Sequence, residues 1–171
     1  MNTATSVAAG RWVVDLAATR ATFAARHLFG PPVPGSIAVT SGTVEVGEDG
    51  RPLRLHATLD PASVDTGNPR RDTDLRGKRF LFVDSYPRME VVADRITVTA
   101  GGWSAAATFC ARGLEAPLRI DAILEGAVTG PYLDVSAVAR LDLRAVGITV
   151  PGFLVRRRVD LSVSARLTRA V

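Results

Sequence analysis

The feature that most constrains the fold of this chain is an alternation of apolar and polar residues with a period of two. In residues 53–60, every second residue from Leu53 onward is apolar and the residues between are polar. The same pattern recurs in residues 118–125, 135–143 and 158–168. Successive side chains of a β-strand point to opposite faces, so each segment is typical of a strand with one buried and one solvated face. The chain is therefore predicted to consist mainly of amphipathic strands.

Further apolar segments, at residues 12–15, 21–27, 37–46, 89–99 and 103–111, bring the predicted number of strands to about eight or nine. The apolar pattern changes phase between Ala93 and Ile96, which predicts a β-bulge there. Short turn signals, such as Gly101-Gly102, fit antiparallel hairpins. With so little helix to cover it, the apolar face of the sheet must be buried by closure into a barrel or by folding into two layers.

One segment departs from the strand pattern and predicts a short helix near residues 69–77. Asn68 suits the N-cap position, and Pro69 suits the first helical position. Gly77 is predicted to end the helix in a left-handed conformation.

Small residues occupy the predicted inner face of the sheet. The alanines at or near inward positions are Ala57, Ala93, Ala105, Ala107, Ala122, Ala137, Ala139 and Ala165. An eight-stranded barrel lined partly by alanine could keep a cavity, whereas a packed core prefers larger side chains. The alternative is that Phe109, Trp103 and the long loops fill this space, and the pattern alone does not decide between the two.

The overall composition excludes several classes of protein. Hydrophobic residues make up 47% and charged residues 22%, which excludes a disordered chain. No stretch approaches the roughly 20 apolar residues of a membrane-spanning helix. The formal net charge is +4, but the acidic residues are interspersed with the basic ones, so no nucleic-acid partner is expected. The run Arg156-Arg157-Arg158 is interpreted as a solvated strand edge, with contact to anionic head groups as the alternative.

The reactive side chains do not form a recognised catalytic or metal-binding motif. Cys110 is the only cysteine and cannot form an internal disulfide. His27 and His56 fall on opposite strand faces, so no metal site is expected, and His56 is predicted to be solvated. No nucleophile elbow or phosphate-binding loop is present, so no catalytic residue is assigned. A small enzyme that uses His27 or Cys110 is the alternative, and an inert, outward-facing thiol is the preferred interpretation of Cys110.

The N-terminal residues set the expected domain boundary and location. Residues 1–10 have no basic segment followed by an apolar core, so they are predicted to be a flexible lead-in to a single domain at 11–171. A cytoplasmic location is expected for this reason. The abundance of Arg, Ala, Gly and Pro is typical of a GC-rich genome.

Several motifs together resemble the YceI-like family. The first is Trp12-Val13-Val14-Asp15, followed by Arg26-His27, and the most specific is the block Ala62-Ser63-Val64-Asp65-Thr66-Gly67-Asn68. The resemblance continues through Arg71-Asp72, Leu75-Arg76, Phe80, Phe82-Val83, Tyr86-Pro87, Arg112-Gly113 and Pro117-Leu118. It departs at the family's closing Arg-x-x-Phe-Gly strand, for which Arg144-Ala145-Val146-Gly147 is one residue short and lacks the aromatic residue.

The resemblance implies a lipocalin-like, extended up-and-down antiparallel β-barrel. It further implies non-catalytic binding of a long apolar lipid, a polyisoprenoid or an isoprenoid quinone, by a carrier, store or stress-related sensor. No cofactor is expected beyond that lipid or quinone, and the chain is similar to a signal-free subset of the family. A homodimer is one expected assembly. The residues assigned to lipid binding are Trp12, Phe23, His27, Arg71, Phe80, Phe82 and Phe109.

Two of these assignments have structural alternatives. His27 is interpreted either as a contact to a polar lipid head or as a buried histidine that bonds a loop carbonyl. Arg71, with Asp72 and Arg76, is interpreted either as a polar rim that anchors a head group or as a clamp that holds the helix against the barrel.

Overall fold

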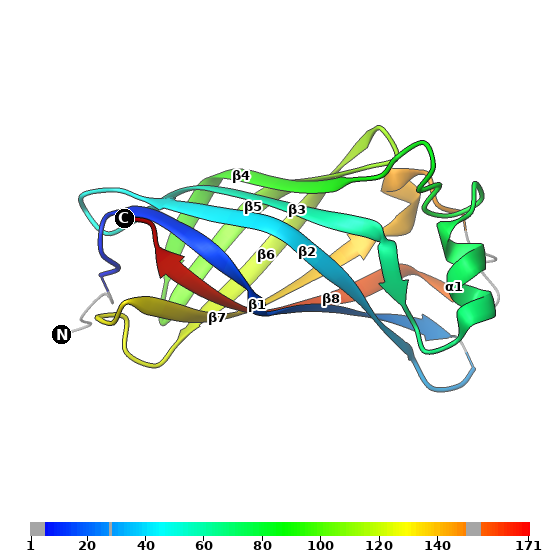
Figure 1. Cartoon of the computed structure of the whole chain (residues 1–171), viewed down its shortest axis with the longest axis horizontal. Helices are drawn as coiled ribbons and strands as arrows, with labels where there is room; N and C mark the ends of the chain where they lie inside the picture. Colours follow the sequence, from blue (N-terminus) through cyan, green and yellow to red (C-terminus); the bar gives the residue numbers. More distant parts are fainter. Residues whose placement is uncertain (1–5, 28, 150–154) are drawn as a thin grey trace.

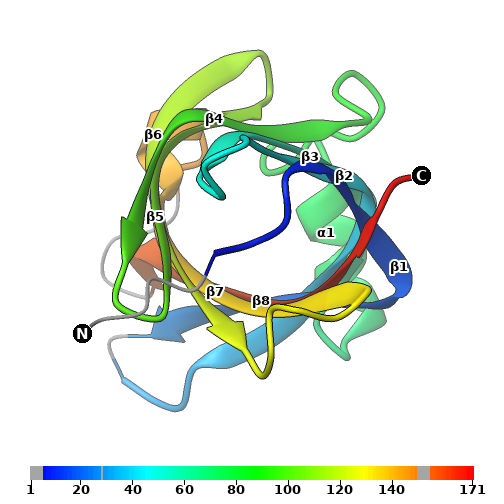
Figure 2. The same ribbon diagram turned by 90° about the vertical axis from the view of Figure 1, so that its left-hand side faces the viewer.

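The computed structural model describes residues 6–27, 29–149 and 155–171. In these residues, eight antiparallel strands, paired in sequence order, form a closed barrel (Figures 1 and 2). They are β1 Gly10–His27, β2 Val33–Val46, β3 Pro52–Asp65, β4 Met89–Thr99, β5 Gly102–Ala111, β6 Leu114–Glu125, β7 Tyr132–Asp142 and β8 Val155–Arg169. The α-helix α1 spans Pro69–Arg76, and the 3-10 helix η1 spans Leu143–Val146. The predicted extended up-and-down barrel with one short α-helix is confirmed.

The two ends of the barrel carry different elements. On the left in Figure 1, the β2–β3, β4–β5 and β6–β7 hairpins meet the C-terminus and the segment before β1. We call this the closed end. On the right lie the β1–β2 loop, α1, the β5–β6 turn and η1, and we call this the helix end.

The closed end is sealed by an apolar cluster. Its buried members are Val7, Trp12, Val44, Val46, Trp103, Leu133, Val135 and Leu167. The segment before β1 crosses this end of the barrel (Figure 2), and Trp12 Nε1 donates a hydrogen bond to the Ala8 carbonyl at 2.9 Å. Residues 1–5 of the predicted flexible lead-in lie outside the described residues, but Val7 is buried, so part of the lead-in belongs to the packing of the barrel.

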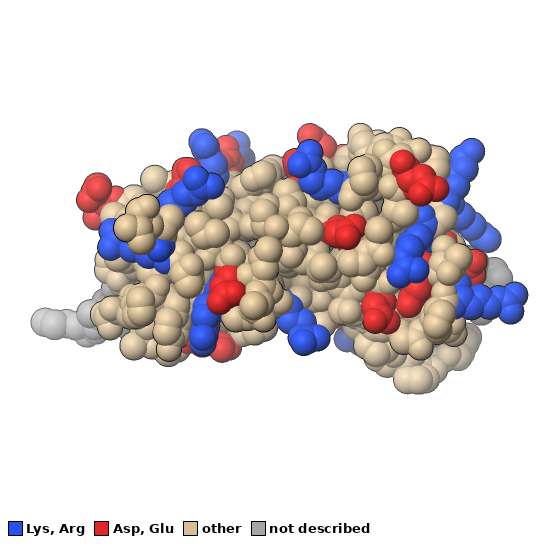
Figure 3. Space-filling model, in the orientation of Figure 1, with Lys and Arg blue, Asp and Glu red and all other residues tan. Residues whose placement is uncertain are grey.

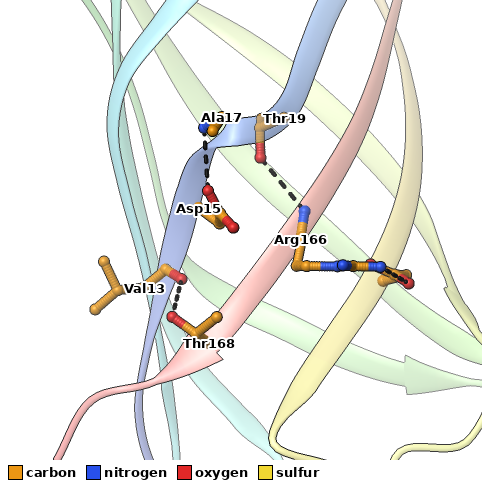
Figure 4. Close-up of polar contacts among 7 residues, drawn as sticks. Val13, Asp15, Ala17, Thr19, Arg166 and Thr168 are labelled. Carbon is orange, nitrogen blue, oxygen red and sulfur yellow. Dashed lines mark hydrogen bonds and ion pairs between the residues drawn. The ribbon is translucent and has the colours of Figure 1, made fainter.

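A long irregularity lies in the middle of β1. The sequence predicts two strands, at residues 12–15 and 21–27, but the structure has one continuous strand whose register against β8 shifts between Asp15 and Arg20. The Asp15 carboxylate accepts a hydrogen bond from the Ala17 amide at 3.0 Å, and the Arg166 amide donates to Thr19 Oγ1 at 3.3 Å (Figure 4). Side chains thus replace ladder bonds where the backbone bulges, so the strand continues.

The bulge predicted in the 89–99 segment is confirmed, because the register between β4 and β5 shifts between Val92 and Arg95. The predicted alternation of burial is followed closely in residues 118–125, but less closely in residues 53–60, where Leu53 is 55% exposed and Thr58 is buried. Ile123, the apolar residue that falls out of phase in its segment, is 62% exposed.

The start of α1 is as predicted, but its end is not. The Asn68 side chain accepts from the amides of Arg70 and Arg71, at 3.1 and 3.2 Å. Gly77 was predicted to be left-handed, and this is wrong, because its backbone is extended at φ −74°. Later amides bond to the last helical carbonyls instead, as in the 2.9 Å bond from Leu81 to Leu75, so a left-handed residue is not needed to satisfy them.

The segment nearest to the family's closing strand motif forms no strand. Arg144, Ala145 and Val146 lie in η1, and Gly147 follows it at φ 74°. Val146 stands where the motif has its aromatic residue, and it is buried in the apolar core next to Leu118 and Leu141. The barrel is closed instead by β8, which pairs with both β1 and β7.

Candidate functional site

The barrel encloses a cavity of about 590 Å³ that is lined by residues from all eight strands. Six of the predicted inward alanines line it, namely Ala57, Ala105, Ala122, Ala137, Ala139 and Ala165. Ala93 and Ala107 are buried in the apolar core of the wall instead. Because alanine carries only a methyl group, the opposite walls of the barrel do not meet. The structure thus decides the alternative that the sequence left open, in favour of a cavity.

Aromatic residues shape the cavity without filling it. Phe23 from β1, Phe80 from the segment after α1, and Phe109 from β5 all line it. The Phe23 ring lies over Gly35 of the paired strand β2, where an added Cβ would be 2.2 Å from the ring atom Cζ. Glycine at this position therefore provides the space in which the Phe23 ring lies.

Two of the seven predicted site residues lie elsewhere in the described structure. Trp12 belongs to the apolar cluster of the closed end and is 1% exposed. Phe82 lies in the segment after α1 at φ 47°, and its ring contacts the Tyr86 ring edge-on with centroids 5.7 Å apart. The structure therefore brings together five of the predicted residues, which are Phe23, His27, Arg71, Phe80 and Phe109.

The polar residues of the lining gather mainly at the helix end, where His27, Thr66, Arg71 and Asp74 border the cavity. Arg71 projects from α1, its Nε donates to Thr66 Oγ1 at 2.8 Å, and its Nη2 donates to the Thr66 carbonyl at 3.0 Å. These two bonds hold the guanidinium at the rim of a mostly apolar cavity.

The same threonine joins the helix to the barrel. Asp72, which is 5% exposed, accepts hydrogen bonds from the Thr66 amide at 3.0 Å and from its hydroxyl at 2.5 Å. Arg76 donates to the carbonyls of Ala62 and Val64 in β3, at 2.7 and 2.8 Å. The predicted clamp is thus confirmed, and because Arg71 also lines the cavity, the clamp and the polar rim are made of the same residues.

Sequence reasoning missed two residues that build this end of the barrel. Thr66 was quoted only as part of a motif, although it accepts or donates four of the bonds that hold Arg71 and Asp72. Arg112, at φ 54° in the β5–β6 turn, donates from Nη1 to the carbonyls of Phe80 and Gly147, at 2.8 and 3.0 Å. It thereby ties together the two segments that cover the helix end. The sequence signal that could have indicated Arg112 is the turn Arg112-Gly113, because a tight turn fixes the position of its arginine at this end of the barrel.

The remaining candidates lie outside the cavity lining. His56 is exposed, as predicted, with Nε2 4.0 Å from Glu90 Oε1. Cys110 is paired with Glu90 and Glu115 in the neighbouring strands, on the face opposite to Phe109. Partial burial, followed by the charges of Glu115 and Glu90, raises the pKa of the thiol. A raised pKa lowers the thiolate fraction at neutral pH, which agrees with the predicted inert thiol.

Within residues 6–27, 29–149 and 155–171, no group of three or more His, Cys, Asp or Glu residues is placed to hold a metal ion. Over the same part of the chain, neither the length nor the apolar character of any helix is sufficient for a membrane crossing.

Curated relatives of this chain are bacterial. A UPF0312 protein of Serratia proteamaculans is 26% identical over 121 residues, which cover 68% of this chain and 63% of the relative. A UPF0312 protein of Yersinia pestis is 27% identical over 79 residues, or 46% of this chain and 41% of the relative. The chain therefore spans less than two thirds of the length of these relatives.

Solved structures share the fold. BcnA of Burkholderia cenocepacia matches with a TM-score of 0.76 at 15% identity, over 90% of this chain and 98% of that one. The YceI protein of Campylobacter jejuni matches with a TM-score of 0.70 at 18% identity, over 85% and 90%. A polyisoprenoid-binding domain from Saccharophagus degradans matches with a TM-score of 0.66 at 12% identity, over 93% and 98%. The sequence profile of the YceI-like domain matches residues 12–167, and the chain belongs to this family.

Proposed function

We propose that this barrel binds a long apolar lipid, a polyisoprenoid or an isoprenoid quinone, inside its cavity. The observation that carries the proposal is the cavity of about 590 Å³, whose lining is apolar along the strands and polar mainly at the helix end. Binding sites for apolar ligands have this composition, with few polar groups that orient the ligand. Membership of the YceI-like family and the similarity to a polyisoprenoid-binding domain support the same ligand class.

The distribution of polar groups favours one orientation of the lipid. The chain would lie along the alanine-lined wall towards the closed end, because Trp103, Val135 and Leu167 line the cavity there. The head group would lie at the helix end, near His27 and Arg71. Arg71 is held in place by Thr66 before any ligand arrives, which lowers the conformational cost of using it as a hydrogen-bond donor.

We propose that binding involves no chemical reaction. Of the two candidates for an enzyme, Cys110 faces away from the cavity, and its thiol has a raised pKa. His27 borders the cavity and is the residue on which the enzyme alternative depends. Recovery of the chemically unchanged lipid after prolonged incubation with the protein would support binding alone, whereas a His27-dependent product would contradict it.

We propose that the protein acts in the cell by retaining a lipid in its enclosed cavity. A carrier, a store and a stress-related sensor all require such retention, and the family resemblance includes all three. The cytoplasmic location and the homodimer stay predictions of the sequence.

The proposal is tested by native mass spectrometry of the protein purified from its own host. We expect a mass increment that is released by organic extraction and corresponds to an isoprenoid lipid. A ligand-free spectrum, together with no uptake of an added isoprenoid quinone, would contradict the proposal.

A matched pair of variants makes this test specific to the cavity. Ala139→Phe adds a ring on the cavity wall, next to the lining residues Ile120 and Leu161 with which Ala139 is paired. The same change at Ala106 adds a ring on the exposed face of β5. We expect Ala139→Phe to lose at least half of the bound lipid and Ala106→Phe to keep it. Equal retention by the two variants would show that the lipid is bound elsewhere.

A further inference from the structure

We propose that the helix end of the barrel docks on an anionic phospholipid surface, through an arginine patch and residues 29–32 of the β1–β2 loop beside it. We define the arginine patch by the residues that line a surface depression, which are Arg26, Arg140, Arg156, Arg157, Arg158 and Asp160. This is a property of the outer surface. It rests on the proposed function only in that docking would bring the cavity mouth to a membrane.

The arginine patch is assembled from three neighbouring strands. Asp160 of β8 lies between Arg26 of β1 and Arg140 of β7, and its two carboxylate oxygens are 2.9 and 3.0 Å from their Nε atoms. One carboxylate is therefore shared by two guanidinium groups, both of which are more than half exposed. Strand β8 adds three consecutive arginines, Arg156, Arg157 and Arg158, directly after its first residue. The depression keeps a clear excess of positive charge.

The surroundings of the arginine patch are basic as well. Arg157 pairs with Asp142 at 3.4 Å, which offsets one further charge. However, residues 69–88, which form α1 and the segment after it at the same end of the barrel, contain six basic and three acidic residues. Figure 3 shows several basic side chains at this end on the face in view, with acidic side chains between them. An anionic surface approached by the helix end therefore meets mainly positive charge.

The β1–β2 loop beside the arginine patch is uncharged and protrudes from the barrel. Phe29 is 90% exposed, and no charged residue occurs between residues 29 and 44. The loop extends beyond the body of the barrel in both ribbon views (Figures 1 and 2), and its tip carries no charged atoms in Figure 3. A large exposed apolar side chain at such a tip is unfavourable in water and favourable in the interfacial region of a bilayer.

The register of the strands places these two features together. His27, the last residue of β1, is paired with Val155, the residue that precedes Arg156, so β1 ends beside the start of the arginine run. His27 also lines the cavity, and a membrane bound by this surface would therefore face the mouth of the cavity.

The combination of charge and apolar surface favours a bilayer over a nucleic acid. Both carry phosphates that arginines can bind, but an uncharged loop with an exposed phenylalanine has no partner on a phosphate backbone. At an anionic bilayer, the basic residues are attracted to the surface potential while the apolar side chain enters the interface.

The experiment is co-sedimentation of the full chain with vesicles of phosphatidylcholine alone or of phosphatidylcholine with phosphatidylglycerol. We expect binding to the anionic vesicles that weakens as salt is added, and little binding to the zwitterionic ones. Equal binding to both vesicle types, or no binding to either at low salt, would overturn the proposal. Retention on duplex DNA with the same variant dependence would overturn it in favour of a nucleic-acid partner.

Variants assign the binding to this surface. Arg156→Gln with Arg158→Gln removes two exposed charges from the arginine patch, and Arg54→Gln with Arg95→Gln removes two exposed charges from β3 and β4 as a matched control. Attraction of each basic residue near an anionic surface corresponds to about a fivefold change in partitioning. We therefore expect the first double variant to bind roughly twentyfold more weakly and the control to lose at most about twofold. Equal losses would overturn the proposal.

The loop is tested separately with Phe29→Ser. We expect weaker binding to anionic vesicles with an unchanged dependence on salt, because no charge is altered. Unchanged affinity would overturn the role of the loop. The bound lipid of every variant is measured by native mass spectrometry, so a loss of membrane docking with full cargo is distinguished from a loss of cargo binding.

Discussion

The segment before β1 at the closed end and α1 at the helix end are attached to the barrel by different physical means. At the closed end, Val7, Trp12 and Leu133 are almost fully buried in one apolar cluster. At the helix end, the only buried residue of α1 is Asp72, and the helix is held by hydrogen bonds to Thr66 and to the carbonyls of β3. Apolar packing stabilises in proportion to the buried area, whereas a hydrogen bond exchanges readily with water.

The comparison suggests how the cavity is entered. Opening the closed end would expose the Trp12 side chain and its neighbours, which is costly. Separating α1 from β3 would break a few polar contacts, each of which water can replace. The helix end is therefore the end at which we expect a lipid to enter, and it is also the end that carries His27 and Arg71.

The largest effect is expected from Trp12→Ala at the closed end. Removal of this buried ring should lower the free energy of unfolding by about 3–5 kcal/mol, because it leaves a void in the apolar cluster. Chemical denaturation measures the change. Trp12→Phe, which keeps most of the packing and loses the bond to Ala8, serves as control and should cost clearly less. A cost below about 1 kcal/mol for Trp12→Ala would break the comparison.

A smaller and more local effect is expected from Asp72→Ala at the helix end. The variant loses both bonds to Thr66 and should destabilise the attachment of α1 by about 1–3 kcal/mol. Hydrogen exchange should show faster amide exchange in residues 66–83 and little change in β5 or β6. Asp84→Asn, at an exposed position after the helix, is the control. A uniform increase of exchange over the whole barrel would mean that the helix end is part of the global fold and not a separate cover.

The smallest effect is expected on the pKa values of two surface carboxylates, and hence on stability at low pH. Hydrogen bonds from Arg26 and then Arg140 hold the pKa of Asp160, at the helix end, below its ordinary value of 3.8. A hydrogen bond from Arg166 lowers the pKa of Asp134, on β7 towards the closed end, in the same way. A carboxylate with a lowered pKa contributes stability above its unfolded-state pKa, and this contribution is lost as the pH falls through the folded-state value.

Carbon-detected NMR titration of the two carboxyl groups measures these shifts. Arg140→Gln should raise the pKa of Asp160 towards 3.8 and leave that of Asp134 unchanged. Because both carboxylates are close to solvent, added salt should weaken both shifts. If Arg140→Gln moved both values equally, the two ends would be coupled, and the comparison would have to be revised.

Much of the fold could be predicted from local sequence. The alternation of side chains is a property of each strand by itself, so residues 53–60 and 158–168 could be recognised without knowledge of their partners. The N-cap at Asn68 is also local, because its bonds reach only two and three residues ahead. The end of α1 could not be predicted in this way, because it depends on later amides, such as that of Leu81, that fold back on the helix.

The site, like the fold, could be predicted only in part. Phe23 and Phe109 were assigned to lipid binding and do line the cavity. The position of a residue in the sequence does not say how far along the barrel it lies, so Trp12, which belongs to the cluster of the closed end, was grouped with them. Arg112 was missed because its two acceptors are 32 and 35 residues away along the chain.

The sequence by itself determined that this chain forms amphipathic strands with small residues on the inner face, because period-two alternation and alanine at inward positions are visible in single segments. The tertiary structure alone decided that one end is sealed by an apolar cluster and that α1 at the other end is attached by polar contacts. That difference arises where segments far apart in sequence meet: Val7 with Leu133 at one end, and Phe80, Arg112 and Gly147 at the other. Which of them meet depends on the closure and register of the whole barrel, and no local pattern encodes it.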